Sequence, residues 1–251
     1  MRTYRILYFG TWGYGKAGLE ALLGLPQADI VKVFSKWDPA SASPYLNQVY
    51  QLAAGNGLPL ENTERRRMPK EAFRRAILEA GEADFILSCC YDRFFPAHIR
   101  AFPGMGALNM HPSLLPAYRG IKPLENALAN GETTIGVTLH ELTRELDAGD
   151  IILQKSAAIN QDHTFGQAYD RQCELIKSCL AEFFANPAMF LANKAPQDHS
   201  RRSEAPRLPF GINDQDTVQE IAQRMKAYTT AAKPKNLPGR LDGPQHQKTG
   251  H

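Results

Sequence analysis

Two polar residues, Asn109 and His111, stand two positions apart in the stretch LNMHPS. On a strand, alternate side chains share a face, so both would point to the same side of a sheet. The amide of Asn109 can donate to an oxyanion, and the imidazole of His111 can accept a proton from an attacking amine. Acyl transfer to an amine needs both functions. Asp147, in RELDAGD, is the candidate for a third group that orients the imidazole. Spacing alone favours the simpler interpretation, ordinary hydrogen bonding at a loop.

The protonation of His111 sets the expected pH dependence of such a reaction. Only a neutral imidazole accepts a proton, so the rate should rise with pH around 6.5, the usual histidine pKa. If Asp147 pairs with the imidazolium, its charge favours the protonated form and should move this midpoint upward.

Short apolar runs alternate with helical stripes along the chain. The runs predict strands at 4–9, 30–34, 84–91, 107–110, 135–142 and 150–159. The stripes predict one helix after the turn at Gly10 and others at 44–54, 70–80, 123–130, 164–184 and 216–228. Strand–helix–strand units in this order form parallel crossovers. The pattern therefore predicts an α/β protein with a mostly parallel open sheet and helices on both faces, plus a short C-terminal appendage. Asn109 and His111 would lie at the carboxyl end of a strand, where such sheets bind ligands.

The local amino-acid composition divides the chain into three parts. Residues 1–190 carry the alternating elements and are expected to form the catalytic domain. Residues 191–231 begin with the proline-punctuated stretch APQDHSRRSEAPRLP and are expected to form a linker and a short appendage. Residues 232–251 have almost no large apolar side chains and are expected to be disordered.

A glycine-rich turn, GTWGYG, follows the first predicted strand. Its glycines stand at 10, 13 and 15, which is not the G-x-G-x-x-G spacing of dinucleotide-binding proteins. A turn that lets a helix pack closely on the sheet is the favoured interpretation. A phosphate or a substrate can still bind at the start of the helix, so Gly10 and Trp12 are candidate substrate contacts.

Composition excludes several classes of protein. The chain has 251 residues and 43% hydrophobic content, and its 29 Lys and Arg against 26 Asp and Glu give a net charge of +3. No apolar run approaches the roughly 20 residues of a membrane span, and no secretory signal is visible, so we expect a cytoplasmic protein with no membrane partner.

The run Arg65–Arg67 is expected to be a solvated turn rather than a phosphate site. The four cysteines form no C-x-x-C pair and predict free thiols. The histidines lack ligand spacing, so no metal is expected.

The string NMHPSLLPAYRG, followed by GVTLHELTRELDAGDII, resembles the signature of the folate-dependent formyltransferase family. That family includes the methionyl-tRNA, glycinamide ribonucleotide and amino-sugar-nucleotide formyltransferases. The similarity extends over roughly the first 190 residues, including FILSCCYDRFFP and the ANGET turn. It implies a Rossmann-like fold without NAD and a formyl group carried by 10-formyltetrahydrofolate. Carried over residue by residue, the catalytic Asn, His and Asp of the family fall on Asn109, His111 and Asp147.

The same resemblance implies a folate pocket. It would be lined by the segment that matches Cys90, Tyr91, Asp92, Arg93, Phe94 and Phe95. The backbone from Leu139 and His140 to Asp147 should help to hold the pterin. Phe94 and Phe95 suit a hydrophobic core equally well, so the resemblance does not settle their individual roles. The role of Asp150 also stays open.

The acceptor is indicated by a second set of residues. The Y-R-G-x-x-P form, at Tyr118–Gly120 and Pro123, resembles the transfer-RNA and amino-sugar branches. Arg119 could pair with a substrate phosphate or carboxylate, or brace its own loop through backbone carbonyls. The transfer-RNA branch has a basic loop after the second strand, whereas KWDPASASPY has one Lys and one Asp. That branch also has a β-barrel C-terminal domain, and only about fifty residues follow Arg201 here.

These departures favour a small acceptor over a nucleic acid, since polyanion binding depends on Lys and Arg. We therefore expect N-formylation of a primary amine, with an amino-sugar nucleotide as the acceptor. Another small amine, methionyl-tRNA, a formylfolate hydrolase and a catalytically silent binding module are the alternatives. A homodimer is compatible with the sequence.

Overall fold

The structure is a computed structural model that describes residues 2–38, 40–41, 46–64 and 68–230. Its main sheet has seven strands in the order β3-β2-β1-β4-β5-β7-β8. The first five are parallel, and β7 and β8 join antiparallel beside β5. Their bounds are β1 Tyr4–Gly10, β2 Ala28–Ser35, β3 Leu60–Asn62, β4 Phe85–Cys89, β5 Gly106–His111, β7 Thr134–Glu141 and β8 Ile151–Ala158.

Eight α-helices surround the sheet in the described part of the chain. They are α1 Trp12–Leu23, α2 Gln48–Gly55, α3 Lys70–Leu78, α4 Ala97–Arg100, α5 Pro123–Ala129, α6 Phe165–Ala185, α7 Pro187–Ala192 and α8 Val218–Thr230. A two-stranded parallel pair, β6 Arg119–Gly120 and β9 Glu204–Ala205, and a 3₁₀ turn at His199–Arg201 complete the fold. The α/β prediction, with a mostly parallel sheet and helices on both faces, is confirmed.

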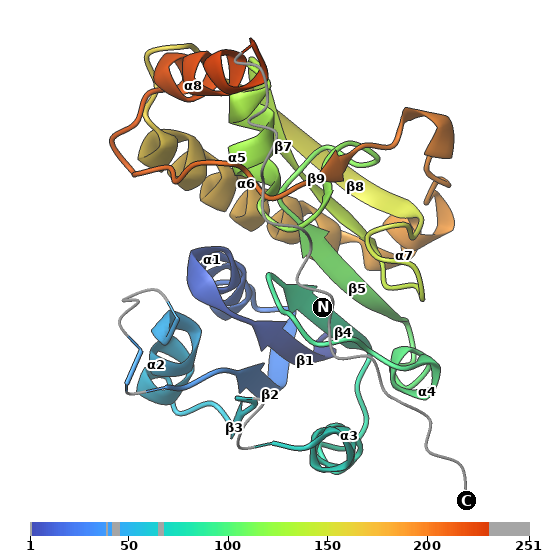
Figure 1. The fold of residues 1–251 in the computed structure, drawn as a ribbon. Helices are drawn as coiled ribbons and strands as arrows, with labels where there is room; N and C mark the ends of the chain where they lie inside the picture. The colour runs from blue at the N-terminus through green and yellow to red at the C-terminus, as the bar shows by residue number, and fades with distance from the viewer. Residues whose placement is uncertain (1, 39, 42–45, 65–67, 231–251) are drawn as a thin grey trace, which may run out of the picture.

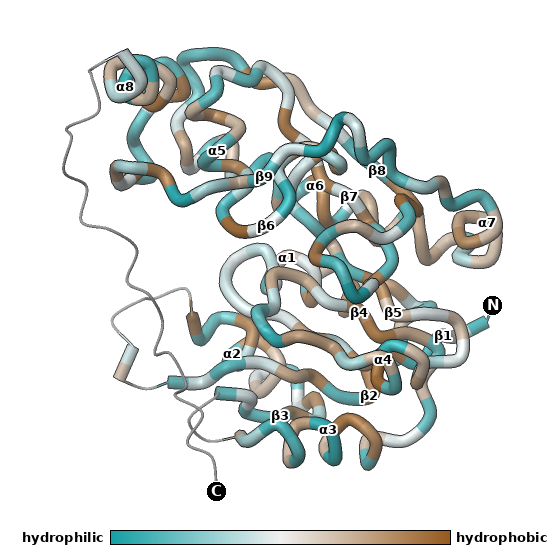
Figure 2. Tube along the Cα trace, turned by 45° about the vertical axis from the view of Figure 1, so that its right-hand side comes forward, coloured by the Kyte–Doolittle hydropathy of each residue, from teal (hydrophilic) through white to brown (hydrophobic). Residues whose placement is uncertain are grey.

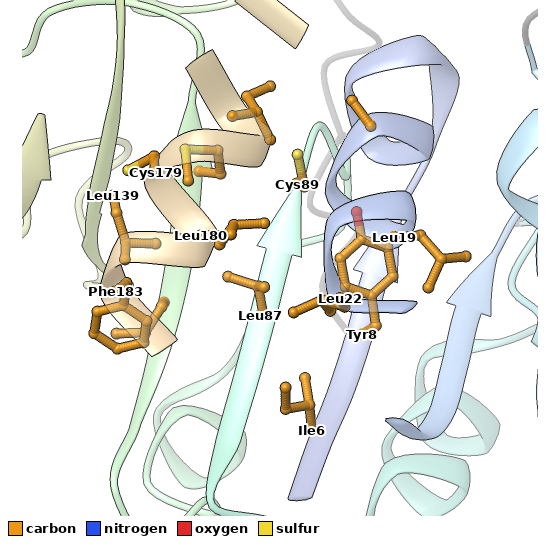
Figure 3. Packing of buried hydrophobic residues seen from close by; sticks show 14 of the residues in the cluster. Ile6, Tyr8, Leu19, Leu22, Leu87, Cys89, Leu139, Cys179, Leu180 and Phe183 are labelled. Carbon is orange, nitrogen blue, oxygen red and sulfur yellow. The ribbon is translucent and has the colours of Figure 1, made fainter. Parts of the chain in front are cut away.

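The central strands are buried on both faces, which is why they read as continuous apolar runs. In β1, Ile6 and Tyr8 pack toward α1 and α6, whereas Leu7 and Phe9 pack toward α3 and α4. Figure 3 shows Leu19, Leu87 and Leu180 among the side chains of the first cluster. Hydrophobic residues follow the middle strands and hydrophilic ones the outer sides of the helices (Figure 2). This packing fixes the carboxyl ends of β1, β4 and β5 relative to one another.

Helix α6 begins at a side-chain cap. Thr164 accepts a hydrogen bond from the backbone N–H of Gln167, and the Gln167 side chain accepts one from the backbone of Thr164. This reciprocal capping box satisfies two otherwise unpaired donors. The helix predicted from residue 164 is therefore present, with Thr164 as its N-cap.

The segment predicted as a linker and appendage packs onto the rest of the molecule. Helix α8 lies beside α5, at the end of the molecule away from β3 (Figure 1). Val218 and Ile221 are buried there against Leu124 and Leu128. The predicted tail, 232–251, and the Arg65–Arg67 turn lie outside the described residues.

Candidate active site

Four polar side chains meet near the carboxyl end of β5. Asn109 and His111 lie on β5, and β7 pairs with it so that His140 stands opposite Asn109. Asp147 reaches the same point from the loop between β7 and β8. The three residues predicted to be catalytic thus lie together. His140, predicted as a folate contact, belongs to the same cluster.

The carboxylate of Asp147 is the centre of the cluster. Oδ2 accepts a hydrogen bond of 3.0 Å from the backbone N–H of Gly120 and lies 3.5 Å from Nδ1 of His111. Oδ1 lies 3.4 Å from Nδ2 of Asn109 and 3.6 Å from Nε2 of His140. Asp147 is only 8% exposed, so these groups replace most of its contact with water.

The two imidazoles differ in their partners. Nδ1 of His140 is 2.9 Å from the carbonyl oxygen of Glu141, so this nitrogen carries the proton. Nε2 of His140 then accepts from the Asn109 amide at 3.1 Å. His111 instead faces two acceptors, because Nε2 lies 2.9 Å from the Tyr118 carbonyl oxygen while Nδ1 faces a carboxylate. An imidazolium satisfies both acceptors, and the neutral ring satisfies one.

Burial and neighbouring charges shift the pKa values of His111 and Asp147 in ways that matter for catalysis. Burial lowers the pKa of His111 below its usual value, and the charge of Asp147 and the Tyr118 carbonyl oppose this without reversing it. The upward shift expected from the sequence is therefore wrong, because the imidazole is 4% exposed and desolvation dominates. Burial raises the pKa of Asp147, but the histidine charges and the N–H of Gly120 outweigh it and lower the pKa to about 2. At neutral pH the pair is a neutral imidazole beside a carboxylate.

Backbone strain concentrates in the loops around this edge. All the described non-glycine residues with a positive φ follow β1, β4, β5 or β7, and they are Trp12 (60°), Cys90 (54°), Tyr118 (59°), Lys122 (56°) and Asp147 (50°). Each such conformation costs of the order of 1–3 kcal/mol and persists only where surrounding contacts hold it. This distribution favours the carboxyl edge as the functional site.

The predicted folate segment, residues 90–95, presents side chains in different directions. Tyr91 and Phe95 pack against Phe9, at ring-centroid distances of 5.5 and 4.9 Å, and belong to the core. The Arg93 guanidinium donates to the Met68 carbonyl at 2.7 Å. Burial raises the pKa of the Cys90 thiol to about 12, so it is not a thiolate nucleophile.

Three other residues of the predicted folate pocket differ in their surroundings. Asp92 holds the ammonium group of Lys36 at 2.5 Å. Leu139 is fully buried, and its strand is paired on both sides. Phe94 is 64% exposed. Of the predicted folate contacts, the structure therefore favours Phe94 for a side-chain contact, and the others stay predictions.

Large apolar side chains border the cluster and suit a flat aromatic ligand. Ile121 follows Gly120, Leu146 precedes Asp147, and both are largely exposed. They flank the hydrogen bond between Gly120 and Asp147. Exposed apolar surface next to buried polar groups is typical of small-molecule sites.

The predicted acceptor contacts have distinct environments. Trp12 is partly exposed, and the Gly10 carbonyl accepts from Ser35 Oγ at 2.8 Å. Arg119 is 2% exposed, and its guanidinium donates to Gln197 at 2.6 and 3.2 Å. Its guanidinium therefore contacts side chains of the segment after α7 rather than the backbone carbonyls of its own loop, and its role toward a substrate stays a prediction. Asp150 lies 4.0 Å from Lys194, outside the cluster.

Two cavities lie away from the cluster. One of about 290 Å³ lies between the end of α5 and α8, and an open groove of about 780 Å³ lies between α1 and α6. Neither is lined by Asn109, His111 or Asp147.

Within the described residues, no group of three His, Cys, Asp or Glu could hold a metal ion, and no helix is long and apolar enough to cross a bilayer. The four cysteines are free thiols.

The sequence did not predict three groups that contact the cluster, two from the backbone and one from a side chain. The N–H of Gly120 and the carbonyl of Tyr118 come from the loop after β5, and the side chain of Gln197 comes from beyond α7. Only the YRG string pointed toward the first two, and no signal pointed to Gln197.

Comparison with known proteins identifies the class. A family model described as formyl transferase matches residues 6–183. The methionyl-tRNA formyltransferase of Nitratidesulfovibrio vulgaris is 32% identical over 231 residues, which are 90% of this chain and 69% of that protein. The chain belongs to the formyl transferase family.

Solved structures share the fold. Glycinamide ribonucleotide transformylase 1 from Symbiobacterium toebii superposes with a TM-score of 0.63 at 22% identity, covering 78% of this chain and 95% of that chain. The N-formyltransferase from Helicobacter canadensis, in complex with folinic acid and dTDP-3-aminofucose, has a TM-score of 0.59 at 20% identity, covering 91% and 81%. The protein is a folate-dependent formyltransferase, and its co-substrate is the 10-formyltetrahydrofolate predicted from the sequence.

Proposed function

We propose that this enzyme transfers the formyl group of 10-formyltetrahydrofolate to the primary amine of an amino-sugar nucleotide. The observation that carries the chemistry is the cluster of a donor, a neutral base and an ionised carboxylate, in which Asp147 lies 3.4 Å from the Asn109 amide and 3.5 Å from His111 Nδ1. The acceptor class rests on separate observations below.

His111 acts as the base in this proposal. The amine nitrogen bonds to the formyl carbon, and the proton it loses passes to His111. The imidazolium that forms keeps the Asp147 carboxylate as the charged partner of its Nδ1. For the amine to reach Nε2, the Tyr118 carbonyl has to move aside, and we assign this movement to substrate binding. When the carbon–nitrogen bond to folate breaks, the proton returns to the departing nitrogen.

Asn109 stabilises the negative charge that develops on the formyl oxygen. One of its amide protons is held by His140 at 3.1 Å. The other faces Asp147 Oδ1 at 3.4 Å, a long contact that a stronger acceptor can replace. Removing one such donor from an oxyanion site typically costs about a hundred- to a thousand-fold in turnover.

The charge next to the site supports a small acceptor. Lys36 is the only basic residue between β2 and α2, and Asp92 neutralises it at 2.5 Å. Binding of a polyanion depends on unpaired cations that contact phosphates. The Y-R-G-x-x-P string fits both the amino-sugar and the transfer-RNA branches, so the choice between them rests on charge. Methionyl-tRNA is the second candidate, because the curated relative that covers 90% of this chain formylates it.

A panel of acceptors tests the proposal. The enzyme is incubated with 10-formyltetrahydrofolate and, separately, UDP- and dTDP-linked amino sugars, glycinamide ribonucleotide, initiator methionyl-tRNA or no acceptor. Mass spectrometry then detects the gain of one formyl group. We expect formylation of an amino-sugar nucleotide and little formate release without an acceptor. Efficient formylation of the tRNA at near-physiological salt, with none of the sugars, refutes the acceptor assignment, and rapid formate release alone indicates a hydrolase.

A further inference from the structure

Gln197 lies beyond the family match, in the stretch that the sequence presented as a linker, yet it is 4% exposed. Its Nε2 donates to the carbonyl oxygens of Asp147 at 2.8 Å and Gly149 at 2.7 Å. Its Oε1 accepts from Nε and a terminal nitrogen of Arg119. Both donors and both lone pairs of the amide are therefore used, which fixes its orientation.

Gln197 is itself held from both sides. Ala195 and Ile151 exchange backbone hydrogen bonds of 2.8 and 2.9 Å, which tie the chain before Gln197 to β8. On the other side, β9 pairs with β6, which contains Arg119. The backbone before Gln197 is therefore paired with β8, and the backbone after it with β6, which limits the movement of the side-chain amide.

These contacts act on the most strained part of the site. Asp147 has a φ of 50°, and a left-handed conformation of this kind needs support from its surroundings. Gln197 holds the Asp147 carbonyl, while the Asp147 carboxylate is held by the N–H of Gly120, the neighbour of Arg119. One side chain therefore links the backbone of Asp147 to the strand that orients its carboxylate.

We propose that Gln197 is a positioning residue that fixes the Asp147 carboxylate against His111. The proposal rests on the role of Asp147 in the proposed function. A carboxylate displaced by about 1 Å can reduce turnover by on the order of a hundredfold, although no group that touches the substrate has changed.

The test compares Gln197→Met with a matched control. Met has a similar length and removes every hydrogen bond without adding charge. Asn126→Leu is the control, because Asn126 is also a buried amide that donates to two backbone carbonyls, those of Lys122 and Pro206, without contacting Asp147. Gln197→Glu is measured in parallel, since it keeps the acceptor for Arg119, replaces the two donors by a second oxygen that faces the Asp147 and Gly149 carbonyls, and adds a negative charge.

Two readouts separate positioning from folding. The first is the pKa of the His111 imidazole by NMR, which needs no acceptor. The charged and titratable groups around it are Asp147, His140 from β7 and Arg119 from β6. Asp147→Asn removes the charge that holds this pKa up, so it should lower the pKa. Gln197→Met should shift it in the same direction, and Asn126→Leu should leave it unchanged. The second readout is single-turnover formyl transfer, with an expected loss of about ten- to a hundred-fold for Gln197→Met or Gln197→Glu.

A double variant decides whether Gln197 acts through Asp147. If it does, Gln197→Met/Asp147→Asn should resemble Asp147→Asn alone, because coupled residues are not additive. Additive losses, or an unshifted His111 pKa with near-normal turnover in the folded Gln197 variants, overturn the positioning role. If Asp147→Asn itself has no effect, the proposed catalytic site fails instead.

Discussion

Replacing Asp147 by Asn removes one charge from the centre of the candidate site. The pKa of this carboxyl is lowered from 3.8 to about 2. A shift of that size corresponds to about 2 kcal/mol of extra stabilisation of the ionised form in the folded protein. Because the folded pKa is depressed, this stabilisation is present above pH 3.8 and is lost as the pH falls toward 2. At pH 7 His111 is neutral, so the part of this stabilisation that comes from the charge of its imidazolium is absent, and the Asn variant should lose clearly less than about 2 kcal/mol of unfolding free energy.

The same variant should affect the chemistry more than the stability. Without the carboxylate, the imidazolium at His111 loses its charged partner. Turnover should fall by on the order of a hundredfold, and the midpoint of the pH–rate profile should move to lower pH. Chemical denaturation and single-turnover kinetics between pH 5 and 8 measure the two effects.

Asp150→Asn is the matched control, because it makes the same charge change three residues away. Its carboxylate lies 4.0 Å from Lys194 and makes no contact with the cluster. The reasoning is refuted if Asp147→Asn retains near-normal turnover, or if its pH–rate midpoint rises.

Four further variants test other parts of the protein. In the wild type the rising limb of the pH–rate profile should lie below pH 6.5, because burial lowers the pKa of His111, and His111→Ala should abolish that limb; a limb that survives in the variant contradicts the assignment of the base. Gly149→Ala should cost about 2 kcal/mol or more in denaturation experiments, because an added Cβ would lie 2.0 Å from the Glu141 carbonyl oxygen, and unchanged stability would show that the loop yields freely. Phe94→Ala should weaken formylfolate binding about tenfold with little change in stability, whereas Phe95→Ala should lose about 3–5 kcal/mol of stability; the reverse pattern would exchange their roles.

The sequence predicted those features of the site that depend on local periodicity. Asn109 and His111 alternate on a real strand, and Thr164 begins a real helix. The place of His140 in the cluster could not be predicted, because it depends on β7 pairing antiparallel with β5 in one register. No local pattern specifies such a register when the two strands are more than twenty residues apart. Gln197 was missed because an isolated amide in a proline-rich stretch has the composition of a loop, and its burial follows only from tertiary contacts.

The protonation states of His111 and Asp147 are complementary at neutral pH. Desolvation keeps the imidazole neutral, and the N–H of Gly120 helps to keep the carboxylate ionised. The base is therefore free to accept a proton before an amine arrives. Accepting it turns a buried single charge into an ion pair of His111 with Asp147, so the contacts of the proton acceptor improve as the reaction proceeds. A site with these properties gains interaction energy in the transition state rather than in the ground state, which is the condition for raising turnover. The strained backbone of Asp147 is consistent with this arrangement, since it places the carboxylate where the charge will form.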